Sequence, residues 1–162
     1  MDIYLIRHAD ALPQGANGID CDEKRTLSDE GWKQAGNLAR ALKKRGIVLD
    51  TIVTSPLARA QQTALQLRTV LELSEAQVEI CDDLAPGGRP KRVAREVNGR
   101  AGNSIALVGH QPDLGYYAGW LLGEKEVQIN FAKGGAALIH VEGSFTKGAG
   151  TLIWLITPEW VE

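Results

Sequence analysis

The sequence predicts one α/β domain over residues 1–162, a three-layer sandwich whose mostly parallel central sheet carries helices on both faces. Short β-branched runs alternate with amphipathic segments along the chain, a pattern typical of parallel sheets connected by helices. The 162 residues are enough for one domain with a hydrophobic core and short for two. Nothing in the sequence demands an assembly larger than a monomer.

Six apolar runs predict the strands of this sheet. The runs at 3–6, 51–54 and 104–108 are typical of buried parallel strands, and the run at 78–80 is a weaker one. The runs at 136–141 and 151–156 predict two strands joined by a glycine-rich turn. Residues 10–24 combine proline, glycine, asparagine and several acids, which predicts a loop.

Capping residues mark the helices between the strands. Ser28 is a suitable N-cap with two acids after it, and Gly46 follows the last turn of that helix as its C′ residue. Ser55 and Pro56 predict the N-cap and the first position of a second helix. The remaining predicted helices are a short basic one near 91–98, after the Pro-Gly-Gly break at 86–88, and one from Pro112 to Gly123.

Composition excludes several classes of protein. The net charge is −2, from 18 Lys and Arg against 20 Asp and Glu, so the basic surface typical of nucleic-acid binding is missing. No apolar run approaches the roughly 20 residues of a membrane helix, and the first residues do not resemble a secretory signal. Cys21 and Cys81 form no CxxC pair, so neither a disulfide framework nor a zinc site is expected, although a single disulfide stays open. We expect a cytoplasmic protein with no membrane or nucleic-acid partner.

Two of the three histidines and two arginines fall at the carboxyl end of the predicted sheet. Arg7 and His8 follow the first strand, His110 follows the fourth, and Arg59 lies in the first turn of the second helix. Ligands of parallel sheets bind beyond the carboxyl ends of the strands. Arginine binds phosphate oxygens in a bidentate way, and a neutral imidazole can attack phosphorus to form a covalent intermediate. The set predicts a phosphoryl-transfer site, in which a second imidazole or imidazolium stabilises developing charge.

Each of these residue types also has a structural interpretation when taken alone. A single histidine is more often a structural or surface group, and a helical arginine such as Arg59 usually covers apolar surface or forms a surface ion pair. His140 lies between apolar residues inside a predicted strand, so we interpret it as structural. Neither cysteine has a basic or helix-start context, so both are interpreted as inert.

Four segments in order resemble the motifs of the histidine phosphatase superfamily, also called the phosphoglycerate mutase-like family. They are L-I-R-H-A-D at 5–10, R-T-L-S at 25–28 with Gly31, Gln34 and Ala35, T-S-P-L-A-R-A-Q-Q-T-A at 54–64, and V-G-H-Q-P at 108–112. The resemblance extends over most of the chain, residues 1–157, and implies a phosphoglycerate mutase-like fold.

Three further segments resemble one subgroup of that superfamily, the compact SixA-type phosphohistidine phosphatases. They are L-A-P-G-G at 84–88, F-A-K-G-G-A at 131–136 and W-L-I-T-P at 154–158. Members of this subgroup lack the inserted lid segments of the mutases, which agrees with the short chain.

The resemblance implies a role for each predicted site residue. His8 is the nucleophile that becomes phosphorylated, Arg7 and Arg59 hold the phosphoryl oxygens, and His110 contacts the same group. The backbone N–H of Gln111 adds a donor. The implied enzyme is a cofactor-independent phosphatase without a metal ion.

Two departures from the family pattern bear on activity. Ala9 replaces the usual glycine after the first histidine, which permits catalysis only if the backbone there does not need a glycine-only conformation. Pro86 stands where mutases and many phosphatases of the family carry an acidic proton donor. An alkyl phosphate needs its leaving oxygen protonated, whereas phosphohistidine has a better leaving group once its ring is protonated. The candidate replacement proton donors are Asp10, Asp82 and Asp83. The structural alternative for Asp10 is a turn residue, and for Asp82 and Asp83 it is a pair of solvated surface groups.

We therefore predict a phosphatase that acts on phosphohistidine in a signalling protein, such as one with a phosphotransfer domain, or on another phosphorylated substrate. One alternative is a phosphatase for small phosphomonoesters, because the motifs define the phosphoryl pocket and not the leaving group. The other is a catalytically weak phosphoprotein-binding module, which the missing acid and Ala9 would suit.

A basic stretch after the third predicted strand has two interpretations. It contains Arg89, Lys91, Arg92, Arg95 and Arg100, with Glu96 opposing them. It is either a docking rim for an acidic phosphoprotein or a solvated helix face, and the helix face is the simpler interpretation.

Overall fold

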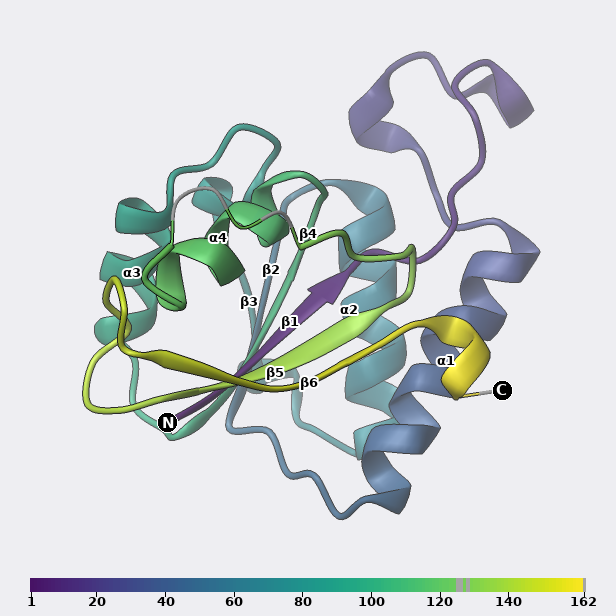
Figure 1. Cartoon of the computed structure of the whole chain (residues 1–162). Helices are drawn as coiled ribbons and strands as arrows, with labels where there is room; N and C mark the ends of the chain where they lie inside the picture. The colour runs from purple at the N-terminus through teal and green to yellow at the C-terminus, as the bar shows by residue number, and fades with distance from the viewer. Residues whose placement is uncertain (125–126, 128, 162) are drawn as a thin grey trace.

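The computed structural model describes residues 1–124, 127 and 129–161, and its centre is a six-stranded sheet in the order β3-β2-β4-β1-β5-β6 (Figure 1). The first four strands along the chain pair in parallel, and the last two are antiparallel to their neighbours. The strands are β1 (Asp2–Arg7), β2 (Thr51–Thr54), β3 (Val78–Ile80), β4 (Ser104–Gly109), β5 (Ala136–Val141) and β6 (Gly150–Ile156).

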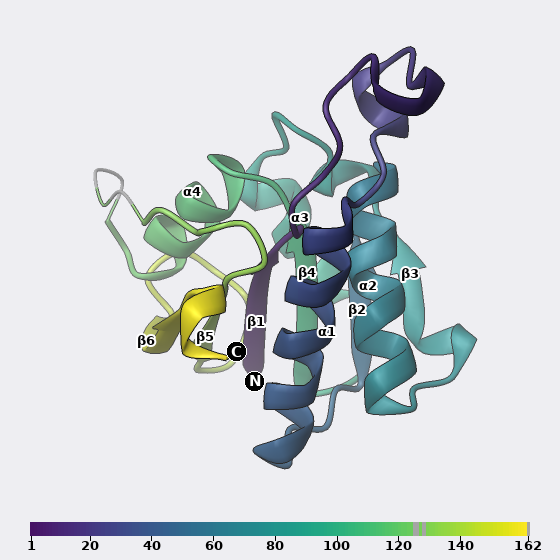
Figure 2. The ribbon, with the colours of Figure 1, turned by 90° about the vertical axis from the view of Figure 1, so that its right-hand side faces the viewer.

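Among the described residues, two α-helices lie on each face of the sheet (Figures 1 and 2). They are α1 (Asp29–Lys44) and α2 (Ala58–Leu71) on one face, and α3 (Pro90–Asn98) and α4 (Asp113–Leu121) on the other. Successive β1 side chains alternate between the two cores: Tyr4 and Ile6 face α1 and α2, and Ile3 and Leu5 face α3 and α4. Full burial of an Ile or Leu side chain contributes about 1.5–3 kcal/mol, so β1 is held from both sides. The predicted α/β sandwich with a mostly parallel sheet is confirmed.

The ends of α1 are those that its sequence predicts. Ser28 is the N-cap, and its Oγ accepts a hydrogen bond from the Gly31 N–H at 3.1 Å. Gly46, just beyond the helix, has a φ of 70°, a left-handed conformation that glycine adopts without strain. The helix therefore starts and stops for local reasons that the sequence contains.

The start of α2 corrects a prediction. Ser55 and Pro56 were expected to be the N-cap and the first helical residue, but α2 begins at Ala58 and its N-cap is Leu57. The Ser55 N–H still pairs with the Val108 carbonyl at 2.9 Å, so the chain stays extended beyond β2 and cannot yet turn into a helix. Arg59 is nevertheless in the first turn of α2, as predicted.

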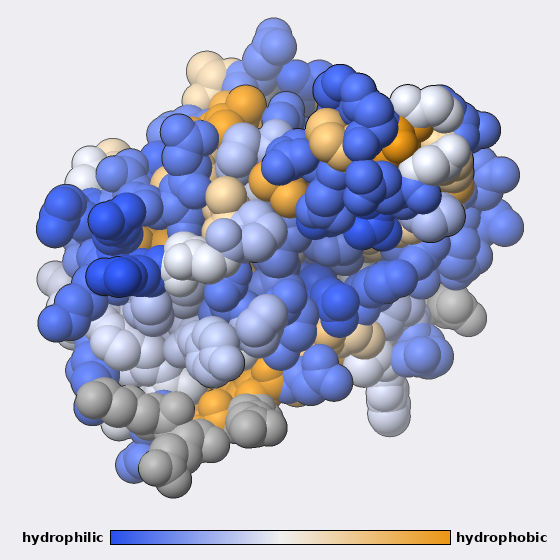
Figure 3. Space-filling view, turned by 90° about the horizontal axis from the view of Figure 1, so that it is seen from above, coloured by the Kyte–Doolittle hydropathy of each residue, from blue (hydrophilic) through white to orange (hydrophobic). Residues whose placement is uncertain are grey.

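The predicted loop after β1 projects from the body of the molecule (Figures 1 and 2, upper right). It contains two short 3₁₀ turns, η1 (Ala16–Gly18) and η2 (Asp22–Lys24), and Ala11 and Leu27 pair at its base. Seen from above, the end toward which β1 and β4 run is covered mainly by hydrophilic residues (Figure 3). The loop forms one side of this end.

β5 and β6 form the predicted hairpin along one edge of the sheet. His140 on β5 lies opposite Asp2, with its Nδ1 2.8 Å from the Asp2 carboxylate, so it is at the far end of β1 from His8. This position agrees with the structural interpretation of His140. Both cysteines, Cys21 and Cys81, are free in the part of the chain that the structure describes. None of the helices described is long and apolar enough to cross a membrane.

Candidate active site

The predicted site residues meet where β1 and β4 end. These strands are neighbours, and the His8 N–H donates to the Gly109 carbonyl at 3.0 Å, so His8 and His110 leave the sheet side by side. Their ring centroids are 5.0 Å apart. Arg59 reaches the pair from α2, and Arg7 is the last residue of β1. Both histidines and Arg59 are buried. The tertiary structure thus brings together Arg7, His8, Arg59 and His110, as the strand-end argument predicts.

The carbonyl group of Ala9 determines the tautomer of His8. Nδ1 of His8 lies 2.7 Å from that carbonyl oxygen, which can only accept a hydrogen bond, so the ring proton is on Nδ1. Nε2 is therefore unprotonated, and the Nε–H of Arg59 donates to it at 3.3 Å. His8 presents a nitrogen lone pair, which is what attack on phosphorus requires.

Ala9 occupies its position without backbone strain. The non-glycine residues with positive φ in the described structure are Asn17 and Glu72, so Ala9 does not have a glycine-only conformation. Its methyl group is fully buried, and its N–H donates to Thr63 Oγ1 at 3.1 Å. The backbone at position 9 therefore does not require glycine, which is the condition for catalysis with alanine there.

Three buried polar atoms lack hydrogen-bond partners among the described residues, and all three belong to predicted site residues. They are Arg7 Nε, His110 Nδ1 and Gln111 Oε1. An unpaired buried polar group costs about 1–3 kcal/mol, and folded proteins keep few of them. Their concentration here marks a region whose polar groups are arranged for a function other than stability.

Burial keeps both imidazole rings neutral. The pKa of His8 is lowered to about 4, mainly by burial and in smaller part by the positive charges of Arg59 and Arg7. Burial likewise lowers the pKa of His110 to about 3, with His8 and Arg59 adding to the effect. The sequence left open whether the second histidine is an imidazole or an imidazolium; in the free protein at neutral pH it is an imidazole.

Neighbouring segments orient the site residues. Nη1 of Arg7 donates to the Phe131 carbonyl at 2.6 Å, and Phe131 opens the 131–136 segment that resembles a phosphatase motif. Nη1 and Nη2 of Arg59 donate to the main-chain carbonyl and the carboxylate of Asp22, at 2.7 and 2.9 Å. His110 Nε2 lies 2.8 Å from Ser55 Oγ. Three segments distant in sequence, at Asp22, Ser55 and Phe131, therefore hold these side chains in place.

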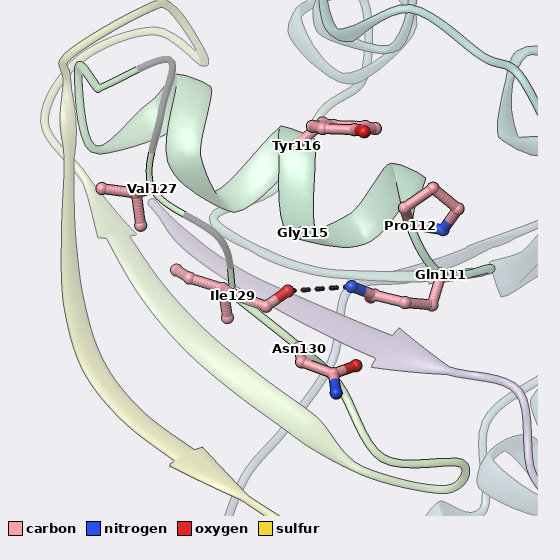
Figure 4. Close-up of a pocket in the computed structure, with 7 residues that line it drawn as sticks. All are labelled: Gln111, Pro112, Gly115, Tyr116, Val127, Ile129 and Asn130. Atoms are coloured by element: carbon pink, nitrogen blue, oxygen red, sulfur yellow. Dashed lines mark hydrogen bonds between the residues drawn. The ribbon is translucent and has the colours of Figure 1, made fainter.

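The side chain of Gln111 turns toward the segment before β5. Its Nε2 donates to the Ile129 carbonyl at 2.9 Å (Figure 4). Gln111 and Tyr116 line a cavity of about 300 Å³ on this side of α4, together with Pro112, Gly115, Val127, Ile129 and Asn130. The phosphate-binding role of Gln111 belongs to its main-chain N–H and stays a prediction.

The contacts of the predicted proton donors do not favour that role. Lys133 Nζ and Ser28 Oγ donate to the Asp10 carboxylate at 2.7 and 2.6 Å, and these bonds lower the pKa of Asp10. A carboxyl group held ionised cannot deliver a proton. Asp82 is exposed, and Asp83 lies 3.6 Å from Arg92 in an ion pair. Within the described part of the chain, no three His, Cys, Asp or Glu side chains are grouped to hold a metal ion.

Sequence reasoning missed three residues that shape the site. Asp22 is one of several acids in the projecting loop, and its one sequence signal is its place three residues before Arg25 in a recognised motif. Lys133 lies in the recognised 131–136 segment, where its charge was not considered. Ser55 was recognised as part of the 54–64 motif but was given no role beyond that of a helix cap, although it contacts His110.

Comparison with protein families is decisive for the class of protein. The model of the histidine phosphatase superfamily (branch 1) matches residues 3–86, just over half of the 162 residues. The chain belongs to the histidine phosphatase superfamily. The matched region includes Arg7, His8 and Arg59, and the family resemblance that the motifs predicted is confirmed.

Two relatives match this histidine phosphatase over nearly its whole length. An uncharacterised protein of a Picosynechococcus strain is 30% identical over 172 aligned positions, which cover 99% of both chains. The phosphohistidine phosphatase SixA of Escherichia coli is 26% identical, and the match covers 98% of this chain and 94% of SixA. A solved structure of the protein histidine phosphatase SixA complexed with tungstate has a TM-score of 0.86 and 26% identity, with both chains fully covered. The resemblance to SixA-type proteins and the phosphoglycerate mutase-like fold are confirmed.

Proposed function

We propose that this histidine phosphatase hydrolyses phosphohistidine in a signalling protein, such as one with a phosphotransfer domain. One observation carries the proposal: two carboxylates near the site, Asp10 and Asp22, are held ionised by cations, and Pro86 stands where mutases and many phosphatases of the family carry an acid. Ionised groups cannot protonate the oxygen of an alkyl leaving group. A phosphohistidine ring that is already protonated leaves as neutral imidazole and does not need that acid.

The reaction proceeds in two displacements at phosphorus. In the first, Nε2 of His8 attacks, the bond from phosphorus to the substrate ring nitrogen breaks, and the substrate imidazole takes the electron pair. In the second, water attacks the phosphoryl group on His8 and orthophosphate is released. The proton on Nδ1 stays against the Ala9 carbonyl throughout, so His8 carries a protonated ring while phosphorylated and leaves as neutral imidazole.

Charge stabilisation comes from the groups around His8. Arg7 and Arg59 hold the equatorial oxygens of the transferring group, and His110 contacts the same oxygens. Phosphoryl transfer depends mostly on such positioning and electrostatics. Because Arg59 and His110 are buried, their interactions with the charged group are weakly screened by water.

Similarity to SixA of Escherichia coli supports the substrate class, since the match extends over almost the full length of both proteins. The basic residues of α3 suit an acidic protein partner, and a monomer is sufficient for the proposed reaction.

The test uses a phosphotransfer domain that carries labelled phosphohistidine, incubated with the wild type and with His8→Ala. The wild type is expected to release orthophosphate at least a hundredfold faster than His8→Ala, because the variant lacks the attacking nitrogen. Equal rates would refute the proposal.

A panel of alkyl phosphates forms the second arm of this test. Turnover of one of them well above phosphohistidine would instead establish a small-molecule phosphatase. Failure to trap label on His8 after a non-acidic quench would favour the phosphoprotein-binding module.

A further inference from the structure

Asp22 lies between two arginines, although it stands in a loop that otherwise projects away from the body (Figures 1 and 2). Its Oδ2 accepts from Arg59 Nη2 at 2.9 Å, and its main-chain carbonyl accepts from Arg59 Nη1 at 2.7 Å. Its other carboxylate oxygen accepts from Arg25 Nη1 at 3.0 Å. The carboxylate thus joins a buried arginine of the site to an arginine of the loop.

The contacts of Arg59 divide between two edges of its guanidinium group. Nη1 and Nη2, at the tip, bind Asp22, while Nε–H points at Nε2 of His8 across 3.3 Å. Nη2 carries a second hydrogen, and this hydrogen lies on the same side as Nε–H. Arg59 therefore keeps a two-donor edge toward the nitrogen that becomes phosphorylated.

Arg25 holds the Asp22 carboxylate in its orientation through the hydrogen bond from Nη1. Nε of Arg25 donates to the Leu12 carbonyl at 2.7 Å, which ties it to the other side of the loop. Ala11 and Leu27 pair next to this contact. Arg25 opens the R-T-L-S segment at 25–28, the recognised motif to which neither the sequence nor the proposed reaction assigned a task.

We infer that Asp22 is a positioning residue: held by Arg25, it fixes the tip of Arg59 so that Nε and Nη2 face the phosphoryl group on His8. The inference rests on the phosphoryl site proposed above. A long arginine side chain loses considerable rotamer freedom when it orders around a ligand, so a preset guanidinium binds the group at lower cost. Arg25 and Arg59 flank the negative charge of Asp22, which limits its repulsion of the phosphoryl oxygens.

In the opposite role, the Asp22 carboxylate would occupy the position of the phosphoryl group and exclude the substrate. The geometry disfavours it, because Asp22 takes the guanidinium tip and leaves the edge that faces His8. The two roles predict opposite effects of the same substitution on anion binding.

The first experiment measures tungstate binding by calorimetry, since tungstate occupies a solved SixA structure. Asp22→Ala is expected to weaken binding about tenfold, the size of one charge-assisted hydrogen bond, and Asp22→Asn to restore part of it through its amide oxygen. Asp20→Ala is the matched control, because Asp20 is in the same loop and pairs with exposed Lys24 instead. Tighter binding by Asp22→Ala, or equal loss in both alanine variants, would overturn the inference.

The second experiment combines Asp22→Ala with Arg59→Lys. If Asp22 acts through Arg59, the double variant should bind tungstate no more weakly than Arg59→Lys alone. Additive losses would contradict a positioning role. If the wild type binds no tungstate, the inference that Arg59 is positioned to bind an anion is refuted. If it binds tungstate but does not hydrolyse phosphohistidine, only the proposed substrate is refuted.

Discussion

Nδ1 of His8 and the carbonyl oxygen of Ala9 lie 2.7 Å apart, and this contact turns an ordinary imidazole into a nucleophile of defined direction. The proton is held on the side of the main chain, and the lone pair of Nε2 faces Arg59. Because the contact is made by a main-chain group, replacing the family glycine by Ala9 leaves it intact. The side chain at position 9 instead fills a buried space.

The tautomer and charge of His8 can be observed directly. We expect nitrogen NMR to show a proton on Nδ1 and no charge on the ring down to about pH 5, since the pKa of His8 is lowered to about 4. The His8→Asn variant assigns the signal. A ring that becomes charged near the ordinary histidine pKa of about 6.5 would contradict the burial on which the mechanism depends.

Stability should depend on pH because of the same two histidines. Their pKa values are about 4 and 3 when folded, and about 6.5 when unfolded, so between these values the unfolded state binds more protons. The free energy of unfolding is therefore expected to be fully retained above about pH 6.5 and to fall as the pH drops toward 4. Urea denaturation at pH 7.5, 6.5, 5.5 and 5.0 measures it. His8→Asn with His110→Asn should flatten the curve, and an unchanged slope would disprove the assignment.

Ser55→Ala should destabilise the protein although it removes one oxygen. Ser55 is fully buried, and its Oγ lies 2.8 Å from Nε2 of His110. Without it, both ring nitrogens of His110 would lack partners, at a cost of about 1–3 kcal/mol. Chemical denaturation checks this, with exposed Ser144→Ala as a control expected within about 0.5 kcal/mol of wild type. If Ser55→Ala lowers the free energy of unfolding no more than Ser144→Ala does, the contact between Ser55 and His110 does not contribute to stability.

The basic face of α3 gives a prediction about protein substrates. Arg100 is engaged by Glu79 and Glu96, whereas Lys91 and Arg95 are exposed and have no ion pair with a described residue. Since α3 follows β3, it starts at the end of the sheet where the site lies. We expect Lys91→Glu with Arg95→Glu to lower kcat/KM for a phosphorylated protein about tenfold at low salt, through slower association.

The control for this prediction lies at the opposite end of the molecule. Lys44 and Arg45 end α1 far from the site, so reversing their charges should have little effect on the same reaction. Phosphoramidate, a small compound with a phosphorus–nitrogen bond, should be hydrolysed equally by all variants. A loss with phosphoramidate as well would show that the α3 substitutions disturb the site and not docking.

Local sequence determined much of the framework. Strand and helix periodicity, the Ser28 cap and Gly46 predict elements that the structure contains, because each depends on residues a few positions apart. The predicted start of α2 was wrong because Ser55 is held extended by a hydrogen bond to Val108 of β4. Capping preferences read from neighbouring residues do not include such a contact between strands.

The site divides in the same way. The sequence by itself determined which residues would meet, since the carboxyl ends of the predicted strands and the motifs place Arg7, His8, Arg59 and His110 at one edge of the sheet. Only the tertiary structure decided how they work: that both rings are neutral, and that Asp22 holds Arg59. Burial and long-range hydrogen bonds set protonation and direction, and both depend on groups far apart in the chain.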